Sequence, residues 1–69
     1  MKEFDLTGEE YIELNKLMKL MRMASSGGEA NYLITEGEVM VNGALETQKR
    51  KKLRAGDIVL FQGQTVKVK

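Results

Sequence analysis

The sequence contains no cysteine and no histidine, and this absence limits most strongly what a 69-residue chain can fold into. Chains of this size often rely on disulfides, a structural metal or association, because a small core contributes little stability. Without thiols or imidazoles, disulfides cannot form and the commonest zinc ligands are missing. Apolar residues make up 42% of the chain. We therefore expect one domain over residues 1–69 that is held by its hydrophobic core, with no metal and no cofactor.

Charge is distributed unevenly along the chain, although the net charge is only +1. Residues 1–46 carry four basic and nine acidic side chains, a net of −5, whereas residues 47–69 carry seven basic and one acidic, a net of +6. Such asymmetry indicates a nucleic acid or a membrane surface as partner. No apolar run approaches the roughly 20 residues that span a bilayer, and the charged start lacks a signal-peptide pattern. We expect a cytoplasmic protein with no membrane partner.

A short helix is predicted early in the chain, with two possible starting points. Thr7 and Glu10 have the spacing of a capping box, in which side chains satisfy the first backbone N–H groups of a helix. A helix from there places one apolar stripe on a single face: Tyr11, Leu14, Leu17, Met18 and Met21. Other apolar residues fall off this stripe: Ile12, Leu20 and Met23. An extended stretch over residues 11–14, followed by a helix from near Leu14, is the alternative, and periodicity does not choose between the two.

A second helix is predicted over residues 27–36. Ser26 and Glu29 repeat the capping-box spacing just before apolar residues at helical intervals, and Gly37 is the expected C-terminal stop. The backbone at Gly27 and Gly28 is unshielded by side chains, and a helix N-terminus attracts anions. A tight turn between two helices, which simply requires glycine, is the alternative explanation of this pair.

After Gly37 the pattern changes from helical to alternating, which is typical of β-strands. Residues 38–41 are predicted as a strand, and Asn42-Gly43 is a strong hairpin signal because both residues tolerate positive φ. Further strands are predicted at residues 58–61 and 65–69, each after a turn that contains glycine. The order of two helices followed by strands indicates an α+β fold with a small antiparallel sheet.

A basic segment lies between two of these strands. It holds five of the eleven basic residues within six positions: Lys49, Arg50, Lys51, Lys52 and Arg54. Leu53 is its only apolar anchor. Such a segment can be a solvated loop, or a charged edge that prevents aggregation. However, no acid neighbours it in sequence, and phosphate would relieve the mutual repulsion of its cations while releasing counterions. We predict that the segment contacts phosphate.

The first helix offers a second basic strip. Lys16, Lys19 and Arg22 follow at three-residue steps and so lie on one flank. If the basic segment folds back beside this flank, the two form one positive surface. The aromatic residues near it, Tyr32 and Phe61, are expected in the core, so stacking on bases is not predicted. Recognition of folded RNA by its shape and its phosphates fits this pattern better.

No enzyme site can be assembled from the sequence. The carboxylate pairs Glu9-Glu10 and Glu36-Glu38 have no nucleophile, general base or metal cluster beside them. We therefore expect neither catalysis nor a small-molecule substrate. The methionines of the first forty residues are expected to fill the core. A protein-interaction adaptor is the alternative function, in which the sheet edge or the methionine-bearing helix docks an acidic partner.

Several motifs together resemble a known family. The run from Ala24 to Ala30, Leu33-Ile34 and the run from Glu36 to Gly43 resemble the RNA-binding domain named after ribosomal protein S4. With Leu17–Leu20, Glu46–Arg50 and Gly56-Asp57, they resemble more narrowly the free-standing bacterial YbcJ/YaaA-like proteins, over about residues 11–63. The resemblance implies the alpha-L motif, an α+β fold in which two short helices pack beside a small bent antiparallel sheet. It also implies a first helix that starts near Leu14, and structured RNA as partner, either ribosomal RNA or a ribosome-associated particle.

The sequence departs from the family at several positions where a basic residue is usual, namely Glu13, Gly27, Asn31 and Gln48. The cations that remain on matching positions are Lys19 and the run from Lys49 to Lys52. We therefore predict a monomeric RNA-binding module in which the basic segment supplies most of the attraction. The predicted RNA-binding residues are Lys16, Lys19, Arg22, Ser26, Gly27, Gly28, Lys49, Arg50, Lys51, Lys52 and Arg54.

Overall fold

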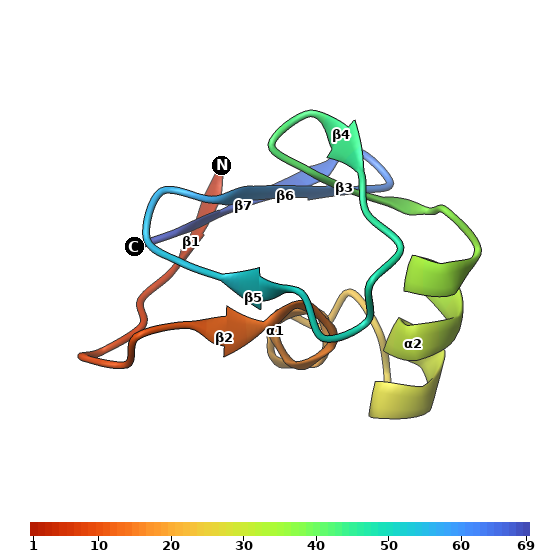
Figure 1. Ribbon diagram of the computed structural model, residues 1–69, viewed down its shortest axis with the longest axis horizontal. Coiled ribbons are helices and arrows are strands. Elements are labelled where there is room, and N and C mark those ends of the chain that lie inside the picture. The colour runs from red at the N-terminus through yellow and green to blue at the C-terminus, as the bar shows by residue number, and fades with distance from the viewer.

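Two helices and a two-stranded ribbon lie on one side of a five-stranded sheet in the computed structural model, which describes residues 1–69 (Figure 1). The elements follow in the order β1 (Lys2–Phe4), β2 (Ile12–Glu13), α1 (Leu14–Leu20), α2 (Gly27–Thr35), β3 (Val39–Val41), β4 (Ala44–Leu45), β5 (Lys52–Leu53), β6 (Ile58–Phe61) and β7 (Gln64–Val68). The predicted α+β class, with two short helices beside a small sheet, is confirmed.

The larger sheet has the strand order β1-β7-β6-β3-β4. Its last four strands pair antiparallel, as predicted. In addition, β1 pairs parallel with the edge of β7, which makes the sheet mixed. The sequence did not predict this strand, because three residues are too few to show an alternating pattern. The smaller sheet is the antiparallel ribbon of β2 and β5.

The first helix begins at Leu14, and the alternative start at Thr7 is wrong. Thr7 has φ of +51° and Gly8 has φ of +88°, so the backbone turns there instead of starting a helix. The Thr7 amide donates to the Asp5 carboxylate at 2.8 Å. The chain then runs extended, since Ile12 pairs with Leu53 across the ribbon and both side chains are buried. Long-range pairing has overridden a local capping signal.

The second helix is close to its prediction. The Ser26 hydroxyl accepts a hydrogen bond from the Glu29 amide at 3.1 Å, and the Glu29 carboxylate accepts one from the Ser25 amide at 2.8 Å. The helix ends at Thr35, one residue before the predicted end. Gly37 follows with φ of +80°, a conformation in which a side chain would be strained.

Neither α1 nor α2 has the length and the apolar composition that a membrane-spanning helix requires.

The core lies between the helices and the inner face of the sheet. All 16 buried residues are hydrophobic, and their side chains come from every layer of the fold. Leu53 is fully buried and is the point at which the basic segment is anchored in this core. Met18 and Met23 are buried as well, which confirms that these methionines fill the core.

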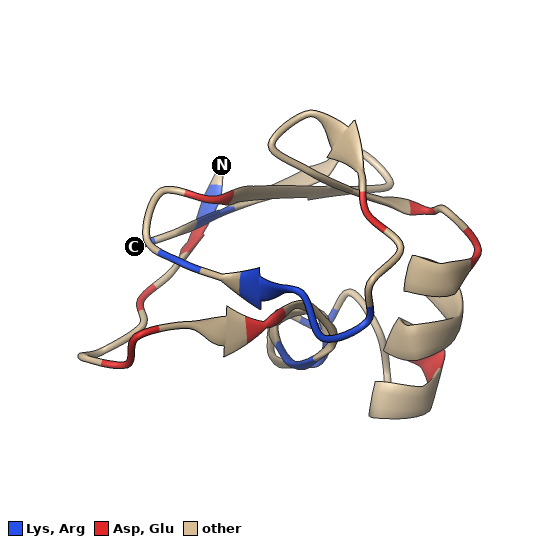
Figure 2. Ribbon diagram, in the orientation of Figure 1, with Lys and Arg blue, Asp and Glu red and all other residues tan.

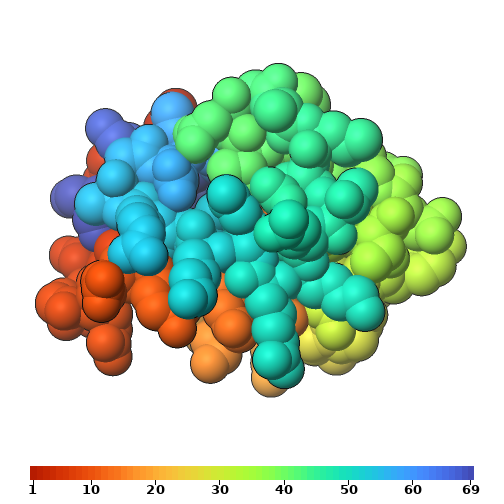
Figure 3. All heavy atoms as spheres, viewed as in Figure 1, coloured from red at the N-terminus to blue at the C-terminus, as the bar shows by residue number.

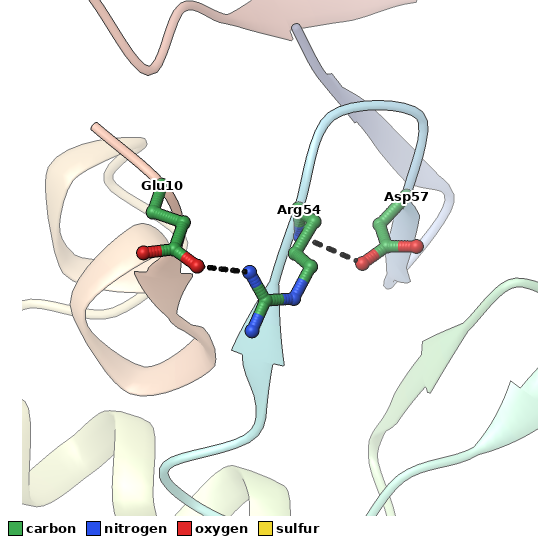
Figure 4. Close-up of polar contacts among 3 residues, drawn as sticks. All are labelled: Glu10, Arg54 and Asp57. Atoms are coloured by element: carbon green, nitrogen blue, oxygen red, sulfur yellow. Dashed lines mark hydrogen bonds and ion pairs between the residues drawn. The ribbon is translucent and has the colours of Figure 1, made fainter. Parts of the chain in front are cut away.

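Two turns that are distant in sequence are tied together by Asn42 and Asp57. The predicted hairpin is present, with φ of +53° at Asn42 and +82° at Gly43. The Asn42 amide nitrogen donates to Asp57 Oδ1 at 3.0 Å, and Asn42 Oδ1 accepts from the Ile58 amide at 2.9 Å. Asp57 Oδ2 accepts from the Arg54 amide at 2.8 Å (Figure 4). These bonds hold the C-terminal end of the basic segment against the β3–β4 hairpin.

The anchoring role of Leu53 can be tested by the substitution Leu53→Ala. Removing a fully buried leucine side chain is expected to lower the free energy of unfolding by about 2–5 kcal/mol. That is a large share of the roughly 3–10 kcal/mol expected for a domain of this length. Urea unfolding followed by circular dichroism measures it. Leu20→Ala is the matched control, because Leu20 is 57% exposed and its loss should change the stability by less than about 0.5 kcal/mol. Equal effects of the two substitutions would contradict this role.

Candidate nucleic-acid interface

The basic segment is fixed to the start of helix α1 through its backbone. The N-cap residue Glu13 forms no side-chain cap. Instead, the Leu14 amide donates to the Lys51 carbonyl at 2.9 Å, and the Asn15 amide donates to the Lys49 carbonyl at 3.0 Å. The first amides of a helix have no partner within it, so the loop satisfies groups that would otherwise remain open. The loop and the helix therefore hold each other in place.

The loop also has its own internal bonds. The Gln48 amide donates to the Glu46 carboxylate at 3.1 Å, and the Lys51 amide donates to the Gln48 carbonyl at 3.2 Å. Figure 2 shows the cations along this path, which runs beside the start of α1. The basic segment therefore folds back against the first turn of α1, which the sequence left open as a condition.

Four cations of the segment have no acidic partner. Lys49, Arg50 and Lys52 are exposed, and Lys51 is half-buried. The two ion pairs of the structure involve other basic residues, Arg54 and Lys69. In Figure 3 the segment, in cyan, lies on the face turned to the viewer, between the orange N-terminal residues and α2. This face therefore presents several uncompensated positive charges on a backbone of defined shape.

Arg54 differs from these four cations. Its guanidinium lies 3.4 Å from the Glu10 carboxylate, as Figure 4 shows. The partner of Arg54 is thus no neighbour in sequence but lies 44 positions away, where the charge pattern of the sequence did not reveal it. Both side chains are more than half exposed, at 53% and 82%, so solvent screens the pair and its contribution to stability is small. The Arg54 side chain can be released at little cost.

Two of the three cations of the predicted helix flank lie on α1, and the third lies beyond its end. Lys16 and Lys19 are exposed on α1, whereas Arg22 follows the helix with φ of +59°. Lys19 and Arg22 line a shallow groove next to the start of α2. Lys16 lines a different hollow together with acidic residues, among them Glu9 and Glu13. Arg22 therefore does not continue the flank as a helical residue.

Two backbone amides in the turn from Ser26 to Gly28 have no hydrogen-bond acceptor. The bonds within helix α2 and at its start include none from the Gly27 or Gly28 amide. Neither glycine has positive φ, and a Cβ atom would meet nothing within 4 Å at Gly27. The turn therefore does not require glycine, contrary to the alternative explanation of this pair. The Glu29 carboxylate already bonds the backbone beside these amides, which reduces their attraction for an external anion.

Two positions where the family usually has a cation have structural roles here. Asn31 Oδ1 accepts a hydrogen bond from Asn15 Nδ2 at 2.9 Å, and this bond joins the two helices. Glu13 is half-buried and lies opposite Lys52 in the β2–β5 ribbon. The neutral pair between the helices stabilises their packing but offers no charge to a phosphate.

Tyr11 was missed by the sequence analysis, which placed it on the buried stripe of a helix. It is 38% exposed, with Lys52 Nζ at 5.0 Å and Arg54 Cζ at 5.7 Å from the ring centre. The alternative prediction, with residues 11–14 extended, would have placed Tyr11 correctly. Successive side chains of a strand point to opposite faces, so Tyr11 points to solvent when Ile12 is buried. Tyr32, expected in the core, is 63% exposed, whereas Phe61 is buried as expected.

Comparison with known proteins agrees with this architecture. The family model of the S4 domain matches residues 4–69. The chain is 44% identical over 68 residues to YbcJ of Escherichia coli strain K12, which covers 99% of this chain and 97% of that protein. It is 37% identical over 54 residues to the "Probable ribosome maturation protein RlbA" of Bacillus subtilis strain 168, which covers 78% of this chain and 76% of RlbA.

The fold of one relative is known from experiment. The solution structure of E. coli YbcJ superposes with a TM-score of 0.75 and covers 99% of this chain and 86% of that one. That structure is described as revealing an alpha-L motif involved in RNA binding. The match of the family model and the identity to YbcJ both extend over nearly the whole chain. The chain therefore belongs to the S4 domain family.

Proposed function

We propose that this chain is a non-enzymatic, monomeric module that binds structured RNA in the cytoplasm, with ribosomal RNA or a ribosome-associated particle as its target. One observation carries the proposal. Lys49, Arg50, Lys51 and Lys52 have no ion-pair partner, and they lie on a loop and the first residue of β5, with the loop backbone bonded to α1. The alpha-L motif described for YbcJ supports RNA as the ligand, and the name of RlbA supports a ribosomal target.

A fixed loop favours binding to a phosphate backbone for two reasons. The cations repel one another, and contact with phosphates relieves this repulsion while releasing the counterions of the RNA. In addition, a backbone that is already ordered loses little conformational entropy when it binds. The four loop cations are the main phosphate contacts in this proposal. Lys19, Arg22 and the turn from Ser26 to Gly28 extend the contact surface, and Lys16 and Arg54 lie at its border.

The salt dependence of binding tests the role of the loop. In the double variant Lys49→Ala/Arg50→Ala, the slope of log K against log salt for an RNA hairpin should flatten by about 1.4–1.8, since each lost phosphate contact removes roughly 0.7–0.9. Fluorescence anisotropy at several salt concentrations measures this slope. Lys2→Ala/Lys67→Ala is the matched control, because it removes the same charge at exposed positions on β1 and β7. An equal change of slope in both variants would mean that the loop makes no specific contact.

The pair of Glu10 and Arg54 gives a second prediction. In Glu10→Gln, the Arg54 guanidinium loses its carboxylate partner and becomes available to phosphate. We expect the affinity for the same hairpin to rise by about 1.5- to 5-fold, which corresponds to the free energy of an exposed ion pair. Glu36→Gln is the control, since Glu36 is exposed and takes part in no ion pair. If both variants raise the affinity equally, the effect comes from net charge, and Arg54 is not a contact.

A further inference from the structure

An open hollow of about 550 Å³ lies beside the basic segment, and Lys16 is the one residue of its lining that also borders the phosphate-contact surface described above. Apolar side chains line it, among them the buried Leu6 and Ile12 and the half-buried Phe4. Tyr11 lines the same hollow and remains 38% exposed. The hollow thus combines a partly apolar lining with an exposed aromatic ring, which is the combination on which an unstacked nucleobase packs.

Tyr11 connects this hollow to the basic segment. Its ring lines the hollow, while Lys52 Nζ and Arg54 Cζ lie 5.0 and 5.7 Å from the ring centre. Cations at this distance are attracted by the aromatic ring and so favour its position beside the basic segment. A phosphate that contacts Lys52 therefore lies near the Tyr11 ring, and a base of the same RNA strand can reach that ring.

The charges around the hollow do not favour a charged occupant. Three carboxylates line it, from Glu9, Glu10 and Glu13. The same number of cations lies in or next to it, from Lys16, Lys52 and Arg54. This balance removes the strong attraction that a basic peptide would need, and it also removes the repulsion that three isolated carboxylates would exert on RNA. The uncharged part of a nucleotide, its base, fits such surroundings.

The carboxylates of Glu9 and Glu13 have free hydrogen-bonding capacity. No hydrogen bond or ion pair in the structure involves either side chain, whereas Glu10 is bonded to Arg54. Carboxylates accept hydrogen bonds from exocyclic amino groups, which adenine, cytosine and guanine carry and uracil lacks. The hollow therefore combines a stacking surface with two acceptors that favour a base with an amino group, since uracil offers only its single ring N–H as donor.

From this arrangement we propose that the hollow binds one unstacked base that carries an amino group, from the same RNA whose phosphates the loop contacts. This inference rests on the proposed function and adds to it a preference for RNA with a bulged or looped-out nucleotide. Tyr11 stacks on the base, and Glu9 and Glu13 accept hydrogen bonds from its amino group.

A set of RNA hairpins tests the inference. The hairpins are identical except for a single bulged nucleotide, which is A, C, G or U, and a fully paired hairpin is the reference. The unmodified protein should bind the A, C or G bulge more tightly than the U bulge or the paired hairpin. In Tyr11→Leu, the affinity for these three bulges should fall by at least about fivefold, the low end of what base stacking on an aromatic ring contributes, while the paired hairpin binds as before. Tyr32→Leu is the matched control, because this tyrosine is exposed on α2, and no residue of α2 lines the hollow.

A second variant tests the preference among the four bases while the Tyr11 ring stays in place. In Glu13→Gln the side chain gains an amide donor, which can bond the carbonyl oxygen of uracil. We expect the affinity for the U bulge to rise toward that for the other three, with little change for the paired hairpin. This substitution alters one terminal group on a half-buried residue, so the fold is retained.

Each other result contradicts a defined part of the account. If all hairpins bind equally in every variant, the hollow holds no base, although the loop still binds RNA. If the protein binds none of the hairpins, the proposed function fails and this inference fails with it. If an arginine-rich peptide binds and Tyr11→Leu weakens it, while bulges make no difference, the hollow belongs to a basic protein partner and the inference is wrong.

Discussion

The structure depends on the contact between the basic segment and the start of helix α1. The loop carbonyls of Lys49 and Lys51 accept hydrogen bonds from the first two amides of this helix. Next to them, β2 pairs with β5 and extends the contact between the two segments. A buried amide without a partner is destabilising by about 1–3 kcal/mol, so helix and loop each stabilise the other. Leu53 completes the contact by anchoring the strand in the core. A cationic loop that would repel itself in isolation is thereby held in one shape.

This contact also determines how charge is arranged on the surface. The loop presents Lys49, Arg50, Lys51 and Lys52 without acidic partners, while the segment that leads into β2 presents Glu9 and Glu10. Because β2 and β5 are neighbours, the acidic and basic stretches meet at the ribbon, where Arg54 pairs with Glu10 and two cations approach Tyr11. The pairing of β2 with β5 therefore fixes the boundary between the acidic and the basic surface. This boundary separates a surface suited to phosphates from a hollow suited to an uncharged group.

Local signals in the sequence predicted much of this fold. The Ser26 cap, the Asn42-Gly43 turn and the burial of Leu53 follow from side-chain chemistry at neighbouring positions, and all three are present. The similar signal at Thr7 failed, because pairing of Ile12 with the distant Leu53 contributes more than one local cap. The parallel strand β1 was too short to predict.

The candidate site was less predictable than the fold. The basic segment is visible as a charge run, but its bonds to α1 connect residues more than 30 positions apart. The pairing of Arg54 with Glu10 and the exposure of Tyr11 likewise depend on which strands become neighbours. A single sequence gives the residue types of such a site, whereas the fold decides which of them meet.

Ultraviolet crosslinking in living cells tests the central claim most directly, with sequencing of the bound RNA and mass-spectrometric location of the crosslinked residues. The account predicts ribosomal RNA, joined to the protein within residues 47–54 and at Tyr11. Crosslinks confined to residues outside the basic segment, α1 and the hollow, or an absence of RNA above the background of a non-binding protein, would contradict it.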